Sequence, residues 1–445
     1  MRHYCDYFKN KKITLLGLGV LGRGVGDAAF LAGCGADLVV TDLKNETELA
    51  SSLEALRGFS NIIFRLGEHT LDDFKNKDFI LKGPNVSESS PYIKEARKNG
   101  IPIKMSASWF MEIAEIPLVG VTGTRGKSTV TALLYDAMKA AGMDVLLGGN
   151  VKGVSTLALL PEVKKNSIAL MELDSWQLAG FGEANISPHV AIFTTFYPDH
   201  LNFYTSMDTY LEDKAHIFLH QKPEDTLIVS SQAVSTLKEK YGKKIVSRVV
   251  VANPLKFPKS WKLKMLGEHN KLNAMCAIEA ARALGIGEET IQEVVENFTG
   301  ISGRLEFIRE VNGIKIYNDT TATTPDATIA ALRALNPKPY TLNPKIILVM
   351  GGADKNLDMT ELIKEIPKQC TALILLPGTG TENLRIKNEE LRIMNVKSLE
   401  EAVLQGMKLT KKGDTLLFSP AFASFGMFKN EFDRGEQFNA IVKEL

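Results

Sequence analysis

The stretch PLVGVTGTRGKSTVT, residues 117–131, combines an apolar strand, a glycine-rich turn and the start of a helix. In a turn of this kind, backbone N–H groups surround a phosphate chain at the N-terminus of the helix. Lys127 is placed to reach the outer phosphates, and Ser128 offers its hydroxyl to a magnesium ion. Apolar residues at helical spacing predict that the helix continues until Gly142 stops it. We therefore expect a nucleoside-triphosphate site here.

The turn departs from the usual G-x-x-x-x-G-K-[ST] pattern. Val121 occupies the position of the first glycine, and Gly120 comes one residue too early. The alternative interpretation is a chance glycine-rich connection between a strand and a helix. The order of strand, turn and helix favours nucleotide binding over this alternative.

Length, composition and charge limit the remaining possibilities. The chain has 445 residues, of which 44% are hydrophobic, so two or three domains with sizeable cores are expected. The formal net charge is +1, with acidic and basic residues nearly balanced, which argues against nucleic acid and acidic membranes as partners. Any anionic substrate must then be bound by local donors.

Cysteine usage and hydropathy predict a soluble, cytoplasmic protein. The cysteines are far apart and form no C-x-x-C pair, so we expect reduced thiols in the core. They are Cys5, Cys34, Cys276 and Cys370. No apolar run reaches the roughly 18 residues that span a bilayer, and the N-terminus lacks the apolar segment of a signal peptide.

Strands alternate with helices almost throughout the chain, which predicts an α/β fold of parallel sheets with helices on both faces. Composition breaks at residues 113–117 and 299–303 separate three parts. We predict domains at residues 1–115, 116–300 and 301–445. Predicted strands of the first and last domains are residues 13–18, 37–41, 345–350, 373–376 and 415–418.

The first domain carries a second glycine-rich turn. Gly17, Gly19 and Gly22 follow a predicted strand with the G-x-G-x-x-G spacing of dinucleotide-binding folds, and Asp42 ends the next strand. Taken alone, this pattern favours NAD and an oxidoreductase, while a purely structural turn is a further alternative. The presence of the phosphate loop instead favours a substrate that carries a nucleotide. Asp42 and Lys44 would then bind the uracil or the ribose of that nucleotide.

The middle domain supplies candidate metal ligands. Glu172 ends a predicted strand, and a carboxylate there suits a magnesium ion that keeps several waters. An ordinary carboxylate at a helix start is the alternative. His200 follows another strand and could ligate a second divalent ion, although isolated histidines are more often structural. His216 and His220 lack the glutamate of a zinc-hydrolase motif and receive no role.

Asn270 and Asn273, in the stretch GEHNKLNA, are predicted to share one helical face. Carboxamides donate to phosphate oxygens and pair with an adenine edge, two contacts that an ATP site needs. Capping of the helix N-terminus is the alternative.

Several motifs, in the right order along nearly the whole chain, resemble the Mur ligases of peptidoglycan synthesis. Among them are GLGVLGRG, TGTRGKST, ELDSWQL, GEHNKLNA, NDTTATTPDAT, GGADKN and SPAFASFGMFKN. Ser128 and the S-P-A-x-A-S sequence near the C-terminus favour the family member that adds glutamate. The resemblance implies an N-terminal Rossmann-like domain for a UDP-linked substrate, a central P-loop ATPase-like domain, and a C-terminal Rossmann-like domain for the amino acid.

The resemblance implies an enzyme, an ATP-dependent carboxylate-amine ligase that uses ATP and Mg²⁺ to add D-glutamate to UDP-N-acetylmuramoyl-L-alanine. A carboxylate is a poor electrophile, so it must first become an acyl phosphate by attack on the γ-phosphate of ATP. Positioning and charge neutralisation accelerate this step. The alternatives are a Mur-type ligase for L-glutamate or another amino acid, an NAD-dependent oxidoreductase, and a non-catalytic nucleotide switch. Partners are expected to be small molecules only, and a monomer is expected.

The resemblance also implies residue roles. The ATP-binding residues would be Gly123, Thr124, Gly126, Lys127, Ser128, Thr129, Asn270, Asn273, Arg304 and Asp319. The metal ligands would be Ser128, Glu172, His200 and a carbamylated Lys214. The catalytic residues would be Lys127, His200, Lys214 and Arg304. The substrate-binding residues would be Gly19, Val20, Leu21, Asp42, Lys44 and Asn150 for the UDP-linked molecule, and Thr323, Lys355, Ser424 and Phe425 for the amino acid.

Three positions limit what the resemblance implies. Judged from its neighbours alone, Lys214 in YLEDKAHIF is a solvated helix lysine. Thr321 stands where the family usually has a lysine, and Glu431 stands where an aromatic residue is common. The last two differences fall where glutamate should bind, so the amino acid is less securely predicted than the ATP chemistry.

Overall fold

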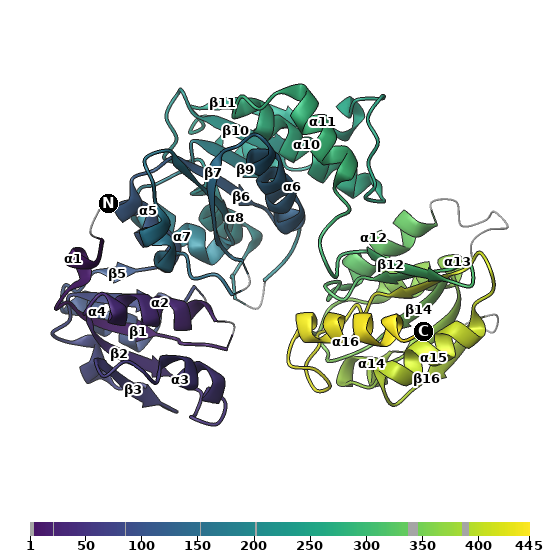
Figure 1. The fold of residues 1–445 in the computed structure, drawn as a ribbon, viewed down its shortest axis with the longest axis horizontal. Helices are drawn as coiled ribbons and strands as arrows, with labels where there is room; N and C mark the ends of the chain where they lie inside the picture. The colour runs from purple at the N-terminus through teal and green to yellow at the C-terminus, as the bar shows by residue number, and fades with distance from the viewer. Residues whose placement is uncertain are drawn as a thin grey trace. The chain divides into compact units, whose positions relative to one another are not determined.

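The computed structural model describes residues 4–20, 22–84, 86–151, 153–200, 203–336, 346–384 and 391–445. These residues form three β-sheets with helices packed on them (Figure 1). The chain divides into two compact units, which consist of Met1–Pro258 with Leu272–Val294 and of Lys259–Lys271 with Val295–Leu445. The first unit holds two sheets and the second unit holds the third.

The first sheet is parallel and has the strand order β3-β2-β1-β4-β5. Its strands are β1 Lys12–Leu16, β2 Asp37–Asp42, β3 Ile62–Leu66, β4 Phe79–Lys82 and β5 Ile103–Lys104. Its helices are α1 Tyr4–Phe8, α2 Arg23–Gly33, α3 Ala50–Leu56 and α4 Pro91–Lys98, with a 3₁₀ turn η1 Leu71–Phe74. The strand order reverses between β1 and β4, so the loops that follow these strands are neighbours, as the bond from Gly83 N to Leu16 O shows at 2.9 Å.

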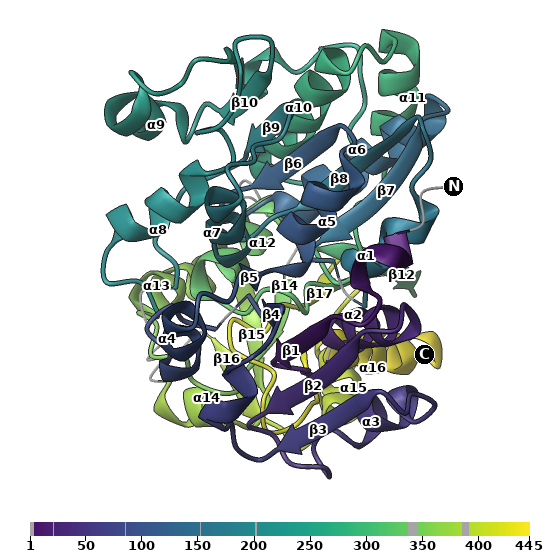
Figure 2. The same cartoon turned by 90° about the vertical axis from the view of Figure 1, so that its left-hand side faces the viewer.

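The second sheet is also parallel and has the order β11-β10-β9-β6-β8-β7. Its strands are β6 Leu118–Thr122, β7 Asp144–Gly149, β8 Ser167–Glu172, β9 Val190–Phe193, β10 Thr226–Ser230 and β11 Arg248–Ala252. Its helices are α5 Ser106–Ala114, α6 Lys127–Ala140, α7 Ser175–Glu183, α8 Met207–Ala215, α9 Val234–Tyr241, α10 Glu268–Ala283 and α11 Glu288–Asn297, with η2 Leu157–Glu162 and η3 Pro254–Lys256. Helix α6 packs across β6, β7 and β8 (Figure 2).

The third sheet has the order β12-β13-β17-β14-β15-β16. Its strands are β12 Glu306–Val311, β13 Ile314–Asn318, β14 Ile346–Met350, β15 Cys370–Leu375, β16 Arg392–Asn395 and β17 Thr415–Phe418. Its helices are α12 Pro325–Leu335, α13 Thr360–Gln369, α14 Thr379–Asn383, α15 Leu399–Leu409 and α16 Glu431–Lys443. Separate hydrophobic clusters form with α12 and α13 and with α15 and α16, so the sheet is covered on both faces.

One strand pair differs from the all-parallel prediction, because β12 and β13 are antiparallel. Asn312 and Gly313 join them with φ angles of 53° and 79°. An Asn-Gly pair between two apolar runs is a strong hairpin signal, since both residues tolerate positive φ. This hairpin was not among the predicted elements.

The α/β fold and the elements around the phosphate loop are confirmed. Strand β6 is fully buried, α6 begins at Lys127, and Gly142 follows its end with φ of 74°. The strand predicted at residues 415–418 coincides with β17. The predicted domain boundaries near residues 115 and 300 stay a prediction.

In the described part of the chain, no helix combines the length and the apolar character needed to cross a bilayer.

The expectation of four reduced core thiols is wrong for two of them. Cys5 and Cys34 form a disulfide, with their Cα atoms 4.5 Å apart. Cys5 is exposed on α1, which packs against α2, and Cys34 caps the C-terminus of α2. The partners meet only through this packing, which leaves no motif in the sequence. Cys276 and Cys370 are buried free thiols, as expected.

Candidate active site

The phosphate loop connects β6 to α6 at the point where the strand order of the second sheet reverses. Ligands of open α/β sheets bind at such points, beyond the carboxyl ends of the strands. Gly123 and Gly126 have φ of 138° and 91°, which a side chain would strain. A Cβ at Gly126 would collide with the amide oxygen of Asn273, so this α10 residue lies directly against the loop. Asn270 lies one turn earlier on the same helix.

The segment after β9 anchors the loop. Thr195 accepts from the amide of Thr124 with its carbonyl oxygen, at 2.7 Å, and from the amide of Arg125 with its hydroxyl, at 2.9 Å. Thr194 donates its hydroxyl to the carbonyl oxygen of Arg125, at 2.6 Å. A loop held in this way can present its amides to phosphate without first having to become ordered.

Two lysine amines meet at one backbone oxygen of the loop. Lys127 Nζ lies 3.0 Å and Lys214 Nζ 3.1 Å from the carbonyl oxygen of Gly123. The prediction of a solvated Lys214 is wrong, because only 1% of this residue is exposed. Burial and the neighbouring charge of Lys127 lower the pKa of Lys214 well below its ordinary value.

Lys214 is buried because of an aromatic cluster on and beside α8. Its amine lies 4.8 Å from the centroid of the Tyr210 ring. Tyr210 contacts the ring of His200, at 6.0 Å between centroids, and His200 contacts Trp176, at 4.7 Å. Tyr210 lies one turn before Lys214 on α8, but Trp176 and His200 come from other parts of the chain, so the sequence around Lys214 did not indicate the whole cluster.

Glu172 is the last residue of β8, and His200 lies in the segment that follows β9. Glu172 is 6% exposed and ends the strand next to β6. Burial lowers the pKa of His200, although the Asp199 carboxylate acts in the opposite direction. The unprotonated imidazole that results is the form that binds a metal. In the part of the chain that the structure describes, no three His, Cys, Asp or Glu side chains gather as a metal cluster.

The donors present nevertheless fit a magnesium ion. Magnesium is usually held by one or two carboxylates, phosphate oxygens and several waters, so it needs no protein cage. Glu172, the Ser128 hydroxyl and His200 offer such a partial set beside the phosphate loop. A carbamylated Lys214 would add a second carboxylate-like group.

Sequence reasoning missed Asp199 and Asp174. Asp199 pairs with Arg125 of the phosphate loop, at 2.8 Å between Oδ2 and Nη1, and accepts from the amide of His200 at 3.0 Å. It thereby ties the histidine to the loop. Asp174 starts α7 with a capping box, accepting from the Gln177 amide at 2.8 Å. The signal for Asp199 was its place directly before His200.

The glycine-rich turn of the first sheet has the expected backbone. Gly17, Gly19 and Gly22 all have positive φ, and Gly22 immediately precedes α2. Asp42 accepts from the amides of Gly19 and Lys44, both at 2.9 Å, so its carboxylate orders this turn. Its predicted contact with uracil or ribose stays a prediction. Val20 is half exposed, and the predicted contact Leu21 lies outside the described residues.

Asn150 lies between this turn and Glu172, the predicted metal ligand. Its amide donates to the carbonyl oxygen of Glu172 at 2.6 Å. Its side-chain oxygen accepts from Arg23 Nη1 at 2.7 Å. Arg23, the first residue of α2, was not singled out in the sequence. Asn150 therefore connects the first sheet to the end of β8.

The second unit carries the remaining predicted residues. Asp319 is buried at the end of β13, where it accepts from the Ser419 hydroxyl at 2.7 Å and from the Leu305 amide at 2.9 Å. Burial raises the pKa of Asp319 to about 7. Arg304 is the nearby positive charge that opposes this rise. The predicted action of Arg304 and Asp319 on ATP is not tested by these contacts.

Two contacts bring together the residues that are predicted to bind the amino acid. Lys355 donates its amine to the Thr323 hydroxyl at 3.0 Å. An antiparallel bridge between Ala353 and Ala423 then brings the loop of Lys355 beside Ser424. Phe425, the next residue, is 67% exposed. A small pocket beside this bridge is lined by Gly351, Gly352, Leu376, Pro377, Ala423, Ser424, Phe425, Met427, Phe428 and Arg434.

Comparison with known proteins gives concordant matches over both units. The model of the Mur ligase middle domain matches residues 121–281, and the model of the Mur ligase glutamate ligase domain matches residues 303–422. A UDP-N-acetylmuramoylalanine–D-glutamate ligase from Roseiflexus sp. (strain RS-1) is 35% identical, with 98% of this chain and 99% of that protein covered. One from Borreliella burgdorferi (strain ZS7) is 36% identical, with 99% of each covered. The chain belongs to the Mur ligase family.

Solved structures of Mur ligases share the fold. UDP-N-acetylmuramate–alanine ligase from Thermotoga maritima gives a TM-score of 0.62 at 20% identity, covering 98% of this chain and 99% of that chain. The MurF ligase of Thermotoga maritima in complex with ADP gives 0.58 at 18% identity, covering 84% and 97%. The family does not favour the alternative of an NAD-dependent oxidoreductase, which rested on the glycine-rich turn of the first sheet.

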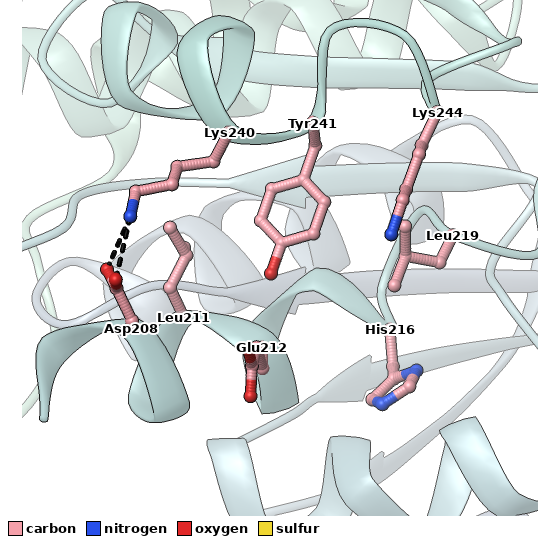
Figure 3. Close-up of a pocket in the computed structure, with 8 residues that line it drawn as sticks. All are labelled: Asp208, Leu211, Glu212, His216, Leu219, Lys240, Tyr241 and Lys244. Atoms are coloured by element: carbon pink, nitrogen blue, oxygen red, sulfur yellow. Dashed lines mark hydrogen bonds and ion pairs between the residues drawn. The ribbon is translucent and has the colours of Figure 1, made fainter. Parts of the chain in front are cut away.

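This Mur ligase also has a surface pocket lined by residues on and near α8 and α9 (Figure 3). It has a volume of about 390 Å³ between α8 and α9. It is lined by Asp208, Leu211, Glu212, His216, Leu219, Lys240, Tyr241 and Lys244. None of these is a predicted site residue. His216 directly follows the end of α8, and its ring stacks on that of His220 with 5.9 Å between the ring centroids.

Proposed function

We propose that this Mur ligase joins D-glutamate to UDP-N-acetylmuramoyl-L-alanine at the expense of ATP, as a monomer in the cytoplasm. The observation that carries the proposal is the convergence of Lys127 and Lys214 on Gly123 in a glycine-rich phosphate loop. Relatives that match nearly the whole chain are named for this reaction, which supports the choice of substrates.

In the proposed mechanism, the phosphate loop positions ATP. The loop amides and the Lys127 amine bind the outer phosphates, where they offset the charge that develops during phosphoryl transfer. Ser128, Glu172 and His200 would hold Mg²⁺, and a carbamate on Lys214 would assist them. Magnesium, when bound, neutralises phosphate charge and so makes the γ-phosphorus more open to attack. Asn273 and Asn270 would complete the nucleotide contacts.

The chemistry then follows in two displacements. The carboxylate of the L-alanyl group attacks the γ-phosphorus, which releases ADP and leaves an acyl phosphate. The uncharged amine of glutamate attacks the acyl carbon, and inorganic phosphate leaves while the amine loses a proton. Lys355, Thr323 and Ser424 would bind the carboxylates of glutamate, a task that suits one ammonium group and two hydroxyls.

The choice of D-glutamate over L-glutamate is supported by the names of the relatives and not by the residues proposed to bind the amino acid. Thr321, which replaces a lysine of the family pattern, donates its hydroxyl to the carbonyl oxygen of Gly303 at 2.9 Å. It therefore supplies no charge to a ligand. L-glutamate or another amino acid is accordingly the second candidate.

The proposal is tested by phosphate release from ATP with UDP-N-acetylmuramoyl-L-alanine and a panel of D- and L-amino acids. We expect release only when acceptor and D-glutamate are both present. Lys127→Ala should lower the rate at least about 100-fold, because it removes a charge from the transition state. Lys139→Ala, on the exposed end of the same helix, is the control and should leave the rate unchanged. Phosphate release that needs neither substrate would indicate a nucleotide switch instead.

A further inference from the structure

The disulfide between Cys5 and Cys34 differs from the two other cysteines in its access to solvent. Cys276 and Cys370 are buried, and burial raises the pKa of Cys276 to about 12. It also raises the pKa of Cys370 well above its ordinary value. Because the thiolate is the reactive form of cysteine, these two thiols are inert. Cys5, in contrast, is exposed on α1, so a small thiol in solution can reach its sulfur.

Helix α1 depends on its contacts with the rest of the protein for its position. It has five residues, and helices this short are not stable by themselves in water. The ring of Phe8 packs against Phe30 of α2, at 5.5 Å between centroids, and against Trp109 of α5, at 5.1 Å. Cys34 caps the C-terminus of α2, so the disulfide fastens α1 to that helix.

The contact surface beneath α1 is imperfect. The Tyr4 hydroxyl and the indole N–H of Trp109 are buried and have no hydrogen-bond partner among the described residues. A buried polar group without a partner destabilises the arrangement that buries it. Release of α1 would let water reach the Tyr4 hydroxyl, which offsets part of the lost apolar packing. The covalent bond therefore has a large influence on whether α1 stays in place.

Helix α2 connects this disulfide to the substrate side of the first sheet. Asp27, in the middle of α2, accepts from Ser106 of α5 at 2.7 Å. Arg23, at its start, donates to Asn150 at 2.7 Å. Asn150 and the glycine-rich turn before α2 are predicted contacts of the UDP-linked substrate. Since α1 packs on both α2 and α5, its loss would weaken the contact that holds α2 and this turn in position.

We propose that Cys5 and Cys34 form a redox-controlled modification site, at which a small thiol such as glutathione opens the disulfide, releases α1 and lowers the affinity for the UDP-linked substrate. This inference rests on the proposed function, which places the protein in the cytoplasm, where disulfides are usually transient or redox-sensing.

The proposed reaction is a thiol–disulfide exchange in two steps. A glutathione thiolate attacks the sulfur of Cys5, the S–S bond breaks, and Cys34 leaves as a thiolate that takes up a proton. A second glutathione thiolate then attacks the glutathione sulfur of the mixed disulfide, which releases oxidised glutathione and the Cys5 thiol. The two electrons come from the two glutathione molecules, and oxidised glutathione drives the reverse reaction.

The test equilibrates the wild type in glutathione buffers that range from fully oxidised to fully reduced, and then alkylates the native protein for mass spectrometry. We expect Cys5 to be labelled in reduced buffer and protected again after a return to oxidised buffer, while Cys276 and Cys370 stay unlabelled throughout. Reduction should also change the fluorescence of Trp109, and Trp109→Phe should lack this change. A disulfide that stays closed in fully reduced glutathione would overturn the inference, and so would reduction without a change in Trp109 fluorescence.

Steady-state kinetics give the functional readout. The KM for UDP-N-acetylmuramoyl-L-alanine should be about fivefold or more higher in the reduced wild type than in the oxidised one, the lower end of typical coupling between two sites. The KM for ATP should stay unchanged. Cys5→Ser should match the reduced wild type in every buffer, whereas the control Asp6→Asn, exposed on the same helix, should keep the redox response.

Two kinetic outcomes would count against different claims. Equal KM values for the UDP-linked substrate in the oxidised and reduced wild type would overturn the inference, because the disulfide would then only stabilise the fold. Ligase activity that is absent from both forms, although the disulfide opens and closes, would instead refute the proposed function on which the inference depends.

Discussion

The amine of Lys214 lies 3.1 Å from the carbonyl oxygen of Gly123, a residue 91 positions earlier in the chain. Its burial and the charge of Lys127 lower the pKa of Lys214. We propose that this amine, in its unprotonated form, attacks carbon dioxide and loses a proton, which would give a carbamate with one negative charge. Such a carbamate would be a possible oxygen ligand for magnesium.

Lys214→Ala should lower kcat at least about 100-fold, because it removes both this ligand and the charge balance of the loop. Lys240→Ala, an exposed lysine paired with Asp208, is the matched control. In addition, ¹³C-labelled carbon dioxide should give one carbamate signal in the NMR spectrum of the wild type that is absent from Lys214→Ala. A wild-type spectrum without this signal would contradict the assignment.

Asp27 gives a prediction about pH. Burial raises its pKa from 3.8 to about 6, so the folded protein favours the protonated carboxyl. The free energy of unfolding should therefore fall as the pH rises from about 4 to about 6, by on the order of 3 kcal/mol, and should stay level above that range. Asp27→Asn keeps an acceptor oxygen but cannot ionise, so it should lack this decline.

Urea unfolding of wild type and Asp27→Asn between pH 4.5 and 8 measures this difference. The variant should be the more stable protein at pH 8, and the advantage should shrink towards pH 4.5. The exposed Asp37 at the start of β2 provides the control substitution, Asp37→Asn. A difference between wild type and Asp27→Asn that does not vary with pH would contradict the prediction.

At the scale of elements, sequence reasoning succeeded where the signal is local. Strand β6, the turn after it and α6 could be predicted because their residues are consecutive and their glycines have one structural use. The turn before α2 was predicted for the same reason. The burial of Lys214 and the bond from Arg23 to Asn150 could not be derived, because both depend on contacts with residues about 90 or more positions away. The disulfide of Cys5 and Cys34 likewise arises from helix packing.

The β12–β13 hairpin leads to an element-scale prediction. Gly313 has φ of 79°, in the left-handed region that costs a residue with a side chain roughly 1–2 kcal/mol. Gly313→Ala should therefore lower the free energy of unfolding of the second unit by about this amount. Gly313→Asn is the matched comparison and should cost less, because asparagine tolerates positive φ. Equal losses in the two variants, measured by thermal unfolding, would contradict the strain argument.

At the scale of the whole molecule, the proposed reaction draws on both compact units. Lys127, Glu172 and Asn150 belong to the first unit, and Arg304 and Lys355 belong to the second. Reactions that use residues of separate units are commonly limited by conformational steps. The residues proposed to bind the UDP-linked substrate, in contrast, all belong to the first unit.

Arg304→Met should consequently separate binding from catalysis. We expect kcat to fall about 100-fold or more, because a charge that stabilises phosphoryl transfer is lost. The dissociation constant of UDP should stay within about twofold of the wild-type value. Arg309→Met, on β12 of the same unit, is the control. A matching loss of UDP affinity in Arg304→Met would show that the residue acts on the fold of the protein and not on phosphoryl transfer.

In the proposed reaction, ATP bound at the loop around Lys127 activates a carboxylate by transferring a phosphoryl group to it. The most direct measurement uses UDP-N-acetylmuramoyl-L-alanine labelled with ¹⁸O in the alanyl carboxylate, with ATP and D-glutamate, and follows the released phosphate by mass spectrometry. An acyl phosphate intermediate predicts one ¹⁸O atom in each phosphate released, because the bridging oxygen leaves with it. Released phosphate without ¹⁸O, formed together with the amide product, would contradict the account.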